Sequence, residues 1–236
     1  MATKHPKKSD PRILVLDIGG THVKLLVTGL KQPVKIPSGP ALTPKAMVQQ
    51  VNQALTDRPY DLVSIGYPCP VVHGHPVREP FNLGSGWVGF NFGKAFSRPV
   101  KIVNDAAMQA LGGYKRGKLL FLGLGTGLGS AMIVDGILEP MELAHLPYKN
   151  GKTYEDYIGL RGLKRLGRRK WEREVGKVVA QLGAALEPEQ VVLGGGNAKK
   201  LKKLPPGTMR GNNQNAFKGG FRLWSEDRRE SQRFRY

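Results

Sequence analysis

Residues 13–29 are ILVLDIGGTHVKLLVTG, and residues 119–136 repeat their pattern as LLFLGLGTGLGSAMIVDG. Each stretch starts with an apolar run typical of a buried strand, turns through glycines, and continues with alternating apolar residues. Each therefore predicts two antiparallel strands joined by a glycine-rich turn. Helical segments separate the two units, which indicates a duplicated α/β architecture of two lobes that face a central cleft.

The rest of the chain predicts further strands and helices. TPKAMVQQVNQAL at residues 43–55 has a threonine N-cap, a proline at the first helical position and the apolar stripe of an amphipathic helix. Strands are predicted at residues 61–66 and 99–105, and another strong helix at residues 171–186. Residues 71–96 are rich in Gly, Pro and Asn and predict a long loop or an irregular hairpin around a site.

The chain has no composition break that would mark a flexible linker between the lobes. We expect an N-terminal lobe of residues 12–104, completed by the C-terminal segment 214–224, and a C-terminal lobe of residues 105–213. We expect residues 1–11 and 225–236 to be flexible termini.

The composition is strongly basic. Lysine and arginine number 37 against 18 acidic residues, so the formal net charge of the 236-residue chain is +19. Such a charge attracts polyanions, and both polyphosphate and nucleic acid qualify. Basic residues cluster at residues 164–173, 199–203 and 228–236; solvated surface charge explains the first two equally well, and disorder is favoured for the last.

Cysteine content and hydropathy exclude several classes of protein. Cys69 is the only cysteine, so neither a disulfide framework nor a cysteine-rich zinc site is expected. The first residues lack the apolar stretch of a secretory signal, and no segment approaches the roughly 20 apolar residues of a membrane span. We expect a soluble, cytoplasmic protein with no membrane partner.

The two glycine-rich turns are candidate phosphate-binding loops. Backbone N–H groups at glycines and a threonine hydroxyl can approach phosphate oxygens closely, although a tight hairpin turn alone would also explain either loop. Asp17, at a predicted strand end, is a candidate for holding Mg²⁺ through water. A third glycine cluster follows the predicted strand at residues 191–193 and suits the distal part of a phosphate donor. The candidate phosphate-binding residues are Asp17, Gly19, Gly20, Thr21, Lys24, Gly125, Thr126, Gly127, Gly194 and Gly195.

Two common nucleotide-binding motifs do not fit these loops. A dinucleotide-binding fingerprint requires G-x-G-x-x-G at the start of a helix, and the loop after Gly123 has neither the spacing nor the helix. Gly151, Lys152 and Thr153 spell the end of a P-loop, but Leu146 occupies the position of its first glycine.

Several motifs, in this order, resemble the ROK family of sugar kinases and repressors: DIGGTHVK, IVNDA, LGLGTGLGSA and VVLGGG. GYPCPVVHGHPVREPFNLGSGWVGFNF, PMELAHLPYKNGKTYEDYIG and LPPGTMRGNNQNAFKGGFRLW resemble the polyphosphate glucokinases within that family. The resemblance covers roughly residues 13–224. It implies a two-lobed actin-like ATPase (ribonuclease H-like) fold. We expect no DNA-binding helix-turn-helix before residue 13, which favours the kinase branch over the repressors.

The resemblance implies that Asp105 is the catalytic base, and chemistry supports the same role independently, because a sugar hydroxyl needs a carboxylate to accept its proton. The alternative is that Asp105 only caps a helix. The resemblance also carries a set of sugar contacts, whose polar groups suit the hydroxyls of a hexose. The implied glucose-binding residues are Asn82, Asn104, Asp105, Glu142, His145 and Glu155.

The implied activity is transfer of a phosphoryl group to the 6-hydroxyl of glucose, with inorganic polyphosphate, and also ATP, as candidate donors and Mg²⁺ as cofactor. Many ROK members carry a cysteine-rich zinc centre; LPYKNGKTYEDY has no cysteine, so no zinc is expected. The resemblance implies a homodimer only by analogy. Two alternatives stay open: an ATP-dependent ROK hexokinase, and a non-catalytic polyanion or nucleic-acid binder, against which the lack of a recognisable nucleic-acid-binding motif argues.

Overall fold

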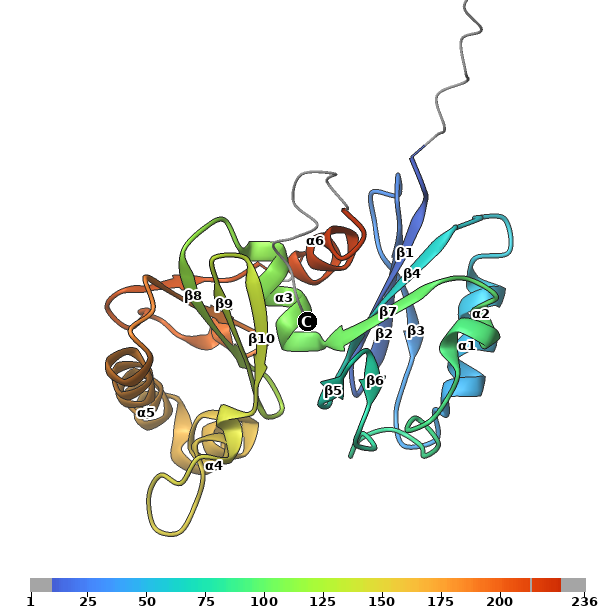
Figure 1. Cartoon of the computed structure of the whole chain (residues 1–236). Coiled ribbons are helices and arrows are strands. Elements are labelled where there is room, and N and C mark those ends of the chain that lie inside the picture. Colours follow the sequence, from blue (N-terminus) through green and yellow to red (C-terminus); the bar gives the residue numbers. More distant parts are fainter. Residues whose placement is uncertain (1–9, 213, 226–236) are drawn as a thin grey trace, which may run out of the picture.

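The chain folds around two five-stranded mixed sheets that lie side by side (Figure 1). A computed structural model describes residues 10–212 and 214–225. In spatial order, the N-terminal sheet consists of β3 (Val34–Pro37), β2 (His22–Val27), β1 (Ile13–Ile18), β4 (Leu62–Tyr67) and β7 (Val100–Asn104). The C-terminal sheet consists of β10 (Ile137–Met141), β9 (Leu128–Val134), β8 (Lys118–Leu124), β11 (Gln190–Gly194) and β12 (Thr208–Arg210).

The two sheets repeat one topology. β1 pairs antiparallel with β2 and parallel with β4, and β8 pairs antiparallel with β9 and parallel with β11. Each predicted glycine-rich hairpin therefore forms, and each supplies a central strand of its sheet. The duplicated α/β architecture expected from the sequence is confirmed.

Helices cover the outer faces of the sheets and fill the space between them (Figure 1). On the N-terminal sheet these are α1 (Pro44–Ala54) and α2 (Phe92–Phe96), and on the C-terminal sheet α4 (Tyr154–Ile158) and α5 (Leu160–Leu186). Between the sheets lie α3 (Asp105–Gly113) and α6 (Asn215–Arg222). Shorter elements are β5 (Val71–Val72), β6 (His75–Pro76) and the 3₁₀ turns Leu143–His145 and Ala198–Lys200.

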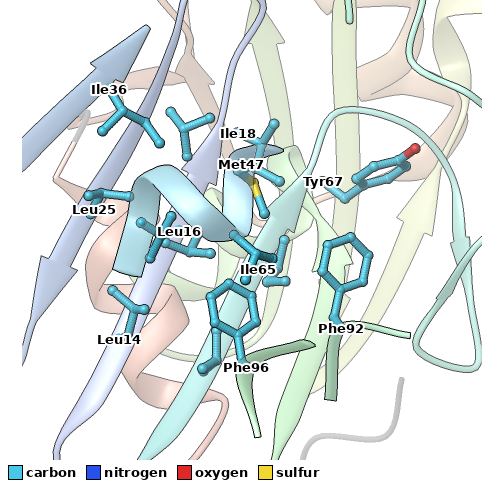
Figure 2. Close-up of a cluster of buried hydrophobic side chains, with 14 of the residues drawn as sticks. Leu14, Leu16, Ile18, Leu25, Ile36, Met47, Ile65, Tyr67, Phe92 and Phe96 are labelled. Atoms are coloured by element: carbon cyan, nitrogen blue, oxygen red, sulfur yellow. The ribbon is translucent and has the colours of Figure 1, made fainter. Parts of the chain in front are cut away.

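Alternation along the central strands creates three layers of apolar side chains, because successive residues of a strand point to opposite faces. Leu14 and Leu16 pack against α1 and α2, as Figure 2 shows with Met47, Phe92 and Phe96 in the same cluster. Val15, between them in sequence, points instead to the central layer around α3 and α6. The same split divides β8 between the central layer and the layer beneath α5.

Helices α3 and α6 cross in direct backbone contact. A Cβ atom added at Gly219 would lie 1.8 Å from the carbonyl oxygen of Met108, so only glycine fits there. The buried Ser64 hydroxyl of β4 donates to the carbonyl of Gly220 at 2.6 Å, and the Arg222 guanidinium donates to the carbonyl of Leu111 at 2.7 Å. Helix α6 thereby ties the C-terminal segment to β4 and to α3.

Most predicted elements form, with one clear error. α1 starts as predicted, and the Thr43 hydroxyl accepts a hydrogen bond from the N–H of Ala46. The helix predicted at residues 171–186 instead begins at Leu160, with a kink at Gly167, whose φ is 70°. Its first half is mostly exposed and rich in lysine and arginine, so it lacks the apolar stripe on which the prediction depended. The segment 71–96 contains the expected irregular hairpin, formed by β5 and β6.

Several predictions about domains and termini are not decided by the fold. The proposed lobe boundaries, 12–104 with 214–224 and 105–213, stay predictions. Residues 1–9 and 226–236, which include the basic tail 228–236 and most of both predicted flexible termini, lie outside the described residues. Within the described part of the chain, no helix is both long enough and apolar enough to cross a membrane.

Candidate active site

Neighbouring strands of the N-terminal sheet bring three candidate residues to one edge. Strands β1, β4 and β7 are parallel, and their register pairs Asp17 with Gly66 and Tyr67 with Asn104. Asp17, Asn104 and the following Asp105 therefore lie at the carboxyl ends of adjacent strands. This edge is where open α/β sheets bind ligands.

Asp105 is the first residue of α3 and lies where strands of both sheets approach the helix. Added Cβ atoms would lie 3.6 Å from the Cα of Asp105 at Gly66 of β4, and 2.9 Å from the Cβ of Ala106 at Gly129 of β9. These two glycines let both sheets approach the start of α3 closely. The Asp105 carboxyl is consequently half-buried between the sheets.

Asn104, and not Asp105, is the N-cap of α3. The Asn104 side-chain oxygen accepts from the N–H groups of Ala106 at 2.9 Å and Ala107 at 3.3 Å, and its amide donates to the carbonyl of Cys69 at 3.3 Å. Among residues 10–212 and 214–225, Asp105 accepts a hydrogen bond only from its neighbour Ala106, at 2.7 Å. Asp105 is thus not the N-cap, and its carboxyl retains capacity for another partner.

The surroundings of Asp105 favour its protonated form near neutral pH. Burial raises the pKa of its carboxyl from 3.8 to about 7, and the negative charges of Asp17 and Glu142 act in the same direction. The N–H of Ala106 and the positive charge of Lys24 partly oppose this rise in pKa. A carboxyl with a pKa close to neutrality can both accept and release a proton under physiological conditions.

The first glycine-rich loop joins β1 to β2 beside this carboxyl. Asp17 is buried, and its Oδ2 accepts from the Lys24 ammonium at 2.8 Å. The N–H of Gly19 donates to the carbonyl of His22 at 3.0 Å, and the Ser38 hydroxyl donates to the carbonyl of Gly19 at 2.5 Å. These bonds fix the loop while Gly20 and the exposed Thr21 face outward.

The second glycine-rich loop, between β8 and β9, contacts the third glycine cluster. The Asn197 amide donates to the carbonyl of Gly125 at 2.8 Å, and the Asn197 N–H donates to the carbonyl of Leu124 at 2.8 Å. A Cβ added at Gly195, where φ is 80°, would lie 2.6 Å from that Leu124 carbonyl oxygen. The structure thus brings the start of the second loop, at Leu124 and Gly125, into contact with Gly195 of the third glycine cluster and with Asn197 directly after that cluster.

The predicted sugar contacts lie around these loops. Asn82 is next to the first loop, since a Cβ added at Gly20 would lie 3.2 Å from the Asn82 Cβ. Glu155 is next to the second loop and accepts from the N–H of Leu128 at 3.3 Å. Glu142 Oε2 lies 3.7 Å from His145 Nε2.

Electrostatics connects these acids into one cluster. Burial raises the pKa of Glu142, and the charge of Glu155 acts in the same direction, against His145 and Arg78. Because Glu142 also acts on the pKa of Asp105, an acidic group extends from Asp17 through Asp105 to Glu142 and Glu155. Among the predicted sugar-binding residues, Asn104 has the least freedom to contact a sugar, because its side-chain amide already forms hydrogen bonds with backbone groups. The assignment of all these residues to glucose and phosphate stays a prediction.

Sequence reasoning missed residues that hold the site in place. Ser38 and Asn197 fasten the first and second loops, and Arg161 pairs with the carboxylate of Glu155 at 3.0 Å. Asn197 directly follows the third glycine cluster, a position that would have been a usable signal; Ser38 and Arg161 have no such signal. Burial raises the pKa of the Cys69 thiol to about 11, which disfavours its nucleophilic thiolate form.

The acidic residues fit a magnesium ion held mainly by phosphate and water. Among the described residues, no three His, Cys, Asp or Glu side chains gather in a way that would form a metal cage. Mg²⁺ usually binds through one or two carboxylates plus water and substrate phosphates, and Asp17 beside a glycine-rich loop supplies such a carboxylate. The donor set therefore fits Mg²⁺ bound together with a phosphate donor.

The repeated sheets, the paired glycine-rich hairpins and the aspartate between them define the actin-like ATPase fold of the ROK sugar kinases. An inorganic polyphosphate/ATP-glucomannokinase from Arthrobacter sp. strain KM superimposes with a TM-score of 0.76 at 25% identity, covering 89% of this chain and 97% of that one. A ROK family glucokinase from Streptomyces griseus, solved with glucose and AMPPNP, gives a TM-score of 0.72 at 16% identity, covering 90% and 98%. The predicted fold class is confirmed.

Sequence comparison narrows the relationship further. A polyphosphate glucokinase of Mycobacterium leprae (strain TN) is 29% identical over 216 residues, which cover 81% of this chain and 65% of the relative. The chain therefore spans about two thirds of the length of that protein. No family model matches the chain. The chain is thus similar in sequence to polyphosphate glucokinases and in structure to ROK sugar kinases, as its motifs predict.

Proposed function

We propose that the protein is a glucose kinase that transfers the terminal phosphoryl group of inorganic polyphosphate to the 6-hydroxyl of glucose. The observation that carries the proposal is the position of Asp105, half-buried between the two sheets, with its pKa raised to about 7 and helix capping provided by its neighbour. The mycobacterial relative named polyphosphate glucokinase and the glucomannokinase named for polyphosphate and ATP support the same class of reaction.

In the proposed reaction, the ionised Asp105 carboxylate accepts the proton of the glucose 6-hydroxyl. The sugar oxygen then forms a bond to the terminal phosphorus, and the bond from that phosphorus to the bridging oxygen breaks. The products are glucose 6-phosphate and a polyphosphate chain shorter by one phosphate. Proton acceptance by a positioned side chain contributes about 10² to 10⁴ in rate.

The remaining candidate residues position the reactants. Asn82, Glu142, His145 and Glu155 would bind the hydroxyls of glucose, and the loops at Gly19–Gly20 and Gly125–Gly127 would bind the phosphates through backbone N–H groups. Lys24 would hold Asp17 in place. Mg²⁺, bound by Asp17 through water, would neutralise phosphate charge when present.

The choice of donor follows from charge as well as from the relatives. A long polyphosphate chain carries far more negative charge than ATP, and a formal net charge of +19 suits the longer anion. ATP is the second candidate donor, since the Arthrobacter structure belongs to a kinase named for both. A cytoplasmic location and a homodimer complete the proposal.

A coupled assay of glucose 6-phosphate tests the proposal. Glucose is offered with Mg²⁺ and either polyphosphate or ATP, and product is measured with each donor. We expect formation of glucose 6-phosphate from polyphosphate. Product from ATP alone would overturn the donor assignment, and no product from either donor would overturn the proposed function.

A further inference from the structure

A basic hollow lies between α5 and the 3₁₀ turn that follows the third glycine cluster. Its lining residues are Leu163, Arg168, Lys199, Lys200, Leu201 and Lys202, and its volume is about 470 Å³. Sites for small ligands typically have volumes of about 300 to 1,000 Å³. The hollow therefore has room for several phosphate groups.

The four cations of this hollow have no carboxylate partner among residues 10–212 and 214–225. All four side chains are exposed, and none takes part in an ion pair. Elsewhere on the same lobe, Lys149, Arg161 and Lys177 each pair with a glutamate. Beside the hollow, the Oε1 atom of Glu172 accepts from the backbone N–H of Lys202 at 2.8 Å. A group of four cations outside the ion pairs of the described residues is suited to bind an anion.

Residues 198–202, which we call the lysine segment, are held in place by hydrogen bonds to neighbouring elements. The Arg210 guanidinium of β12 donates to the carbonyl of Ala198, and to the carbonyl of Leu201 at 3.0 Å. The bond from Lys202 to Glu172 fastens the same segment to α5. On α5, the kink at Gly167 directly precedes Arg168. The backbone that carries these cations is thus fastened to two neighbouring elements, so a ligand would meet a formed surface.

The lysines that line the hollow closely follow, in the chain, residues that contact the candidate phosphate loops. Asn197 is two residues before Lys199, and its side chain bonds the carbonyl of Gly125 in the second loop. The N–H of Ala198 in turn donates to the carbonyl of Gly195 at 3.2 Å. An extended anion whose end occupies the second loop would therefore meet the lysine segment next.

The geometry points to a subsite in which Arg168, Lys199, Lys200 and Lys202 bind the distal phosphates of a polyphosphate chain whose terminal phosphate lies at the glycine-rich loops. This inference rests on the proposed function and adds a second anion site to it. Of the residues that the structure describes, no aromatic one lines the hollow, so these residues offer no platform on which a nucleotide base would stack. Four cations without such a platform favour a linear polyanion over a nucleotide or a nucleic acid.

The test compares two triple variants of equal charge. The first is Lys199→Gln/Lys200→Gln/Lys202→Gln, and the control is Lys31→Gln/Lys35→Gln/Lys45→Gln, whose lysines are exposed on the N-terminal sheet, its connecting turn and α1. The KM of each is measured for long-chain polyphosphate and for tripolyphosphate, with glucose saturating. Circular dichroism establishes that both variants are folded.

We expect the first variant to raise the KM for long-chain polyphosphate about tenfold, since three cation contacts are lost. Its KM for tripolyphosphate should change by less than about twofold, because a short donor occupies only the loops. The control should leave both values within about twofold of the wild type. An equal rise for both donors, or an equal effect of both triple variants, would contradict the subsite.

A direct binding assay separates failure of this inference from failure of the proposed function. Binding of fluorescent long-chain polyphosphate is measured by anisotropy, without glucose, for the wild type and both variants. If the wild type makes no glucose 6-phosphate from any donor, the proposed function fails, and this assay still decides the subsite. Loss of polyphosphate binding only in the first variant supports the subsite. Unchanged polyphosphate binding, or an equal loss of binding to a duplex DNA probe, would overturn it.

Discussion

Asp17 lies close enough to Asp105 that its negative charge raises the pKa of the Asp105 carboxyl. Asp17 is the penultimate residue of β1, and Asp105 directly follows β7. Only β4 lies between these two strands in the sheet. Lys24, paired with Asp17 at 2.8 Å, partly offsets the effect on Asp105. The pKa of the proposed base is therefore set mainly by burial, and further by Asp17 and Lys24 on the two strands of the first hairpin, by Glu142 and by the N–H of Ala106.

This relationship predicts the pH dependence of catalysis. Only the ionised Asp105 accepts a proton, so kcat/KM for glucose should rise from about pH 6 to about pH 8, with an apparent pKa near 7. Lys24→Gln removes a positive charge that lowers the pKa of Asp105, so its profile should move to higher pH. Initial rates across a pH series provide the measurement. A Lys24→Gln profile that coincides with the wild type, or moves to lower pH, would contradict this electrostatic account.

Asp105→Asn should stabilise the protein at alkaline pH while it lowers kcat by about 10² to 10⁴. A carboxyl whose folded-state pKa is raised from 3.8 to about 7 destabilises the fold where it must ionise. This destabilisation is complete above the folded-state pKa and disappears below the unfolded-state pKa. The gain in unfolding free energy should be larger at pH 8 than at pH 5 by roughly 1–3 kcal/mol, since one pKa unit corresponds to about 1.36 kcal/mol and partial exposure reduces the effect.

Urea denaturation of both proteins at the two pH values measures this difference. Glu139→Gln, which changes a carboxyl on the exposed edge strand β10, is the control and should show no such pH dependence. If Asp105→Asn were equally or more destabilising at pH 8, the buried carboxylate would not be under the electrostatic strain that its surroundings indicate.

The close crossing of α3 and α6 predicts that the effect of a Gly→Ala substitution on stability depends strongly on where the glycine lies. Gly219→Ala places a Cβ atom 1.8 Å from the Met108 carbonyl oxygen in the starting geometry, so the helices must separate. We expect a loss of about 1–3 kcal/mol in unfolding free energy. Gly176→Ala on α5 is the matched control, because among the described residues no atom beyond its chain neighbours and the adjacent backbone of its own helix lies within 4 Å of its added Cβ. It should gain about 0.5–1 kcal/mol from helix propensity, and equal effects at both glycines would refute the close crossing.

Much of this architecture can be predicted from local sequence patterns. The period-two alternation of Leu14, Val15 and Leu16 predicts strands covered on both faces, and the Thr43 cap with Pro44 predicts the start of α1. The two hairpins form where apolar strands flank a short glycine-rich turn. Their equivalent places in the two sheets follow from the repeated pattern.

Features that depend on three-dimensional contacts were not accessible in this way. The first half of α5 is mostly exposed, so its sequence shows charge rather than an apolar stripe. Ser38 acts through a backbone carbonyl in the first loop, which leaves no pattern along the chain. Arg168 and Lys199 belong to separate basic runs of the sequence, and only the folded structure brings them together around one hollow. The raised pKa of Asp105 likewise arises from residues that the fold brings together.

At the start of α3, Asn104 has the structural role of N-cap, and the next residue, Asp105, has the proposed catalytic role. Asn104→Ala removes the acceptor for the N–H groups of Ala106 and Ala107 and should lower the unfolding free energy by about 1 kcal/mol. Asn104→Ser retains a capping oxygen and should restore most of that loss. Thermal or urea denaturation of the two variants gives the comparison. Equal destabilisation by alanine and serine would show that the bond to the Cys69 carbonyl, and not the cap, is the important one.

The central claim is that the Asp105 carboxylate takes the proton of glucose during phosphoryl transfer. Its most direct test is the initial rate of glucose 6-phosphate formation from polyphosphate at about pH 8, where the carboxyl is ionised, for the wild type and for Asp105→Asn. The account predicts a folded variant whose kcat is lower by about 10² to 10⁴. A folded Asp105→Asn protein with a kcat within about threefold of the wild type would contradict it.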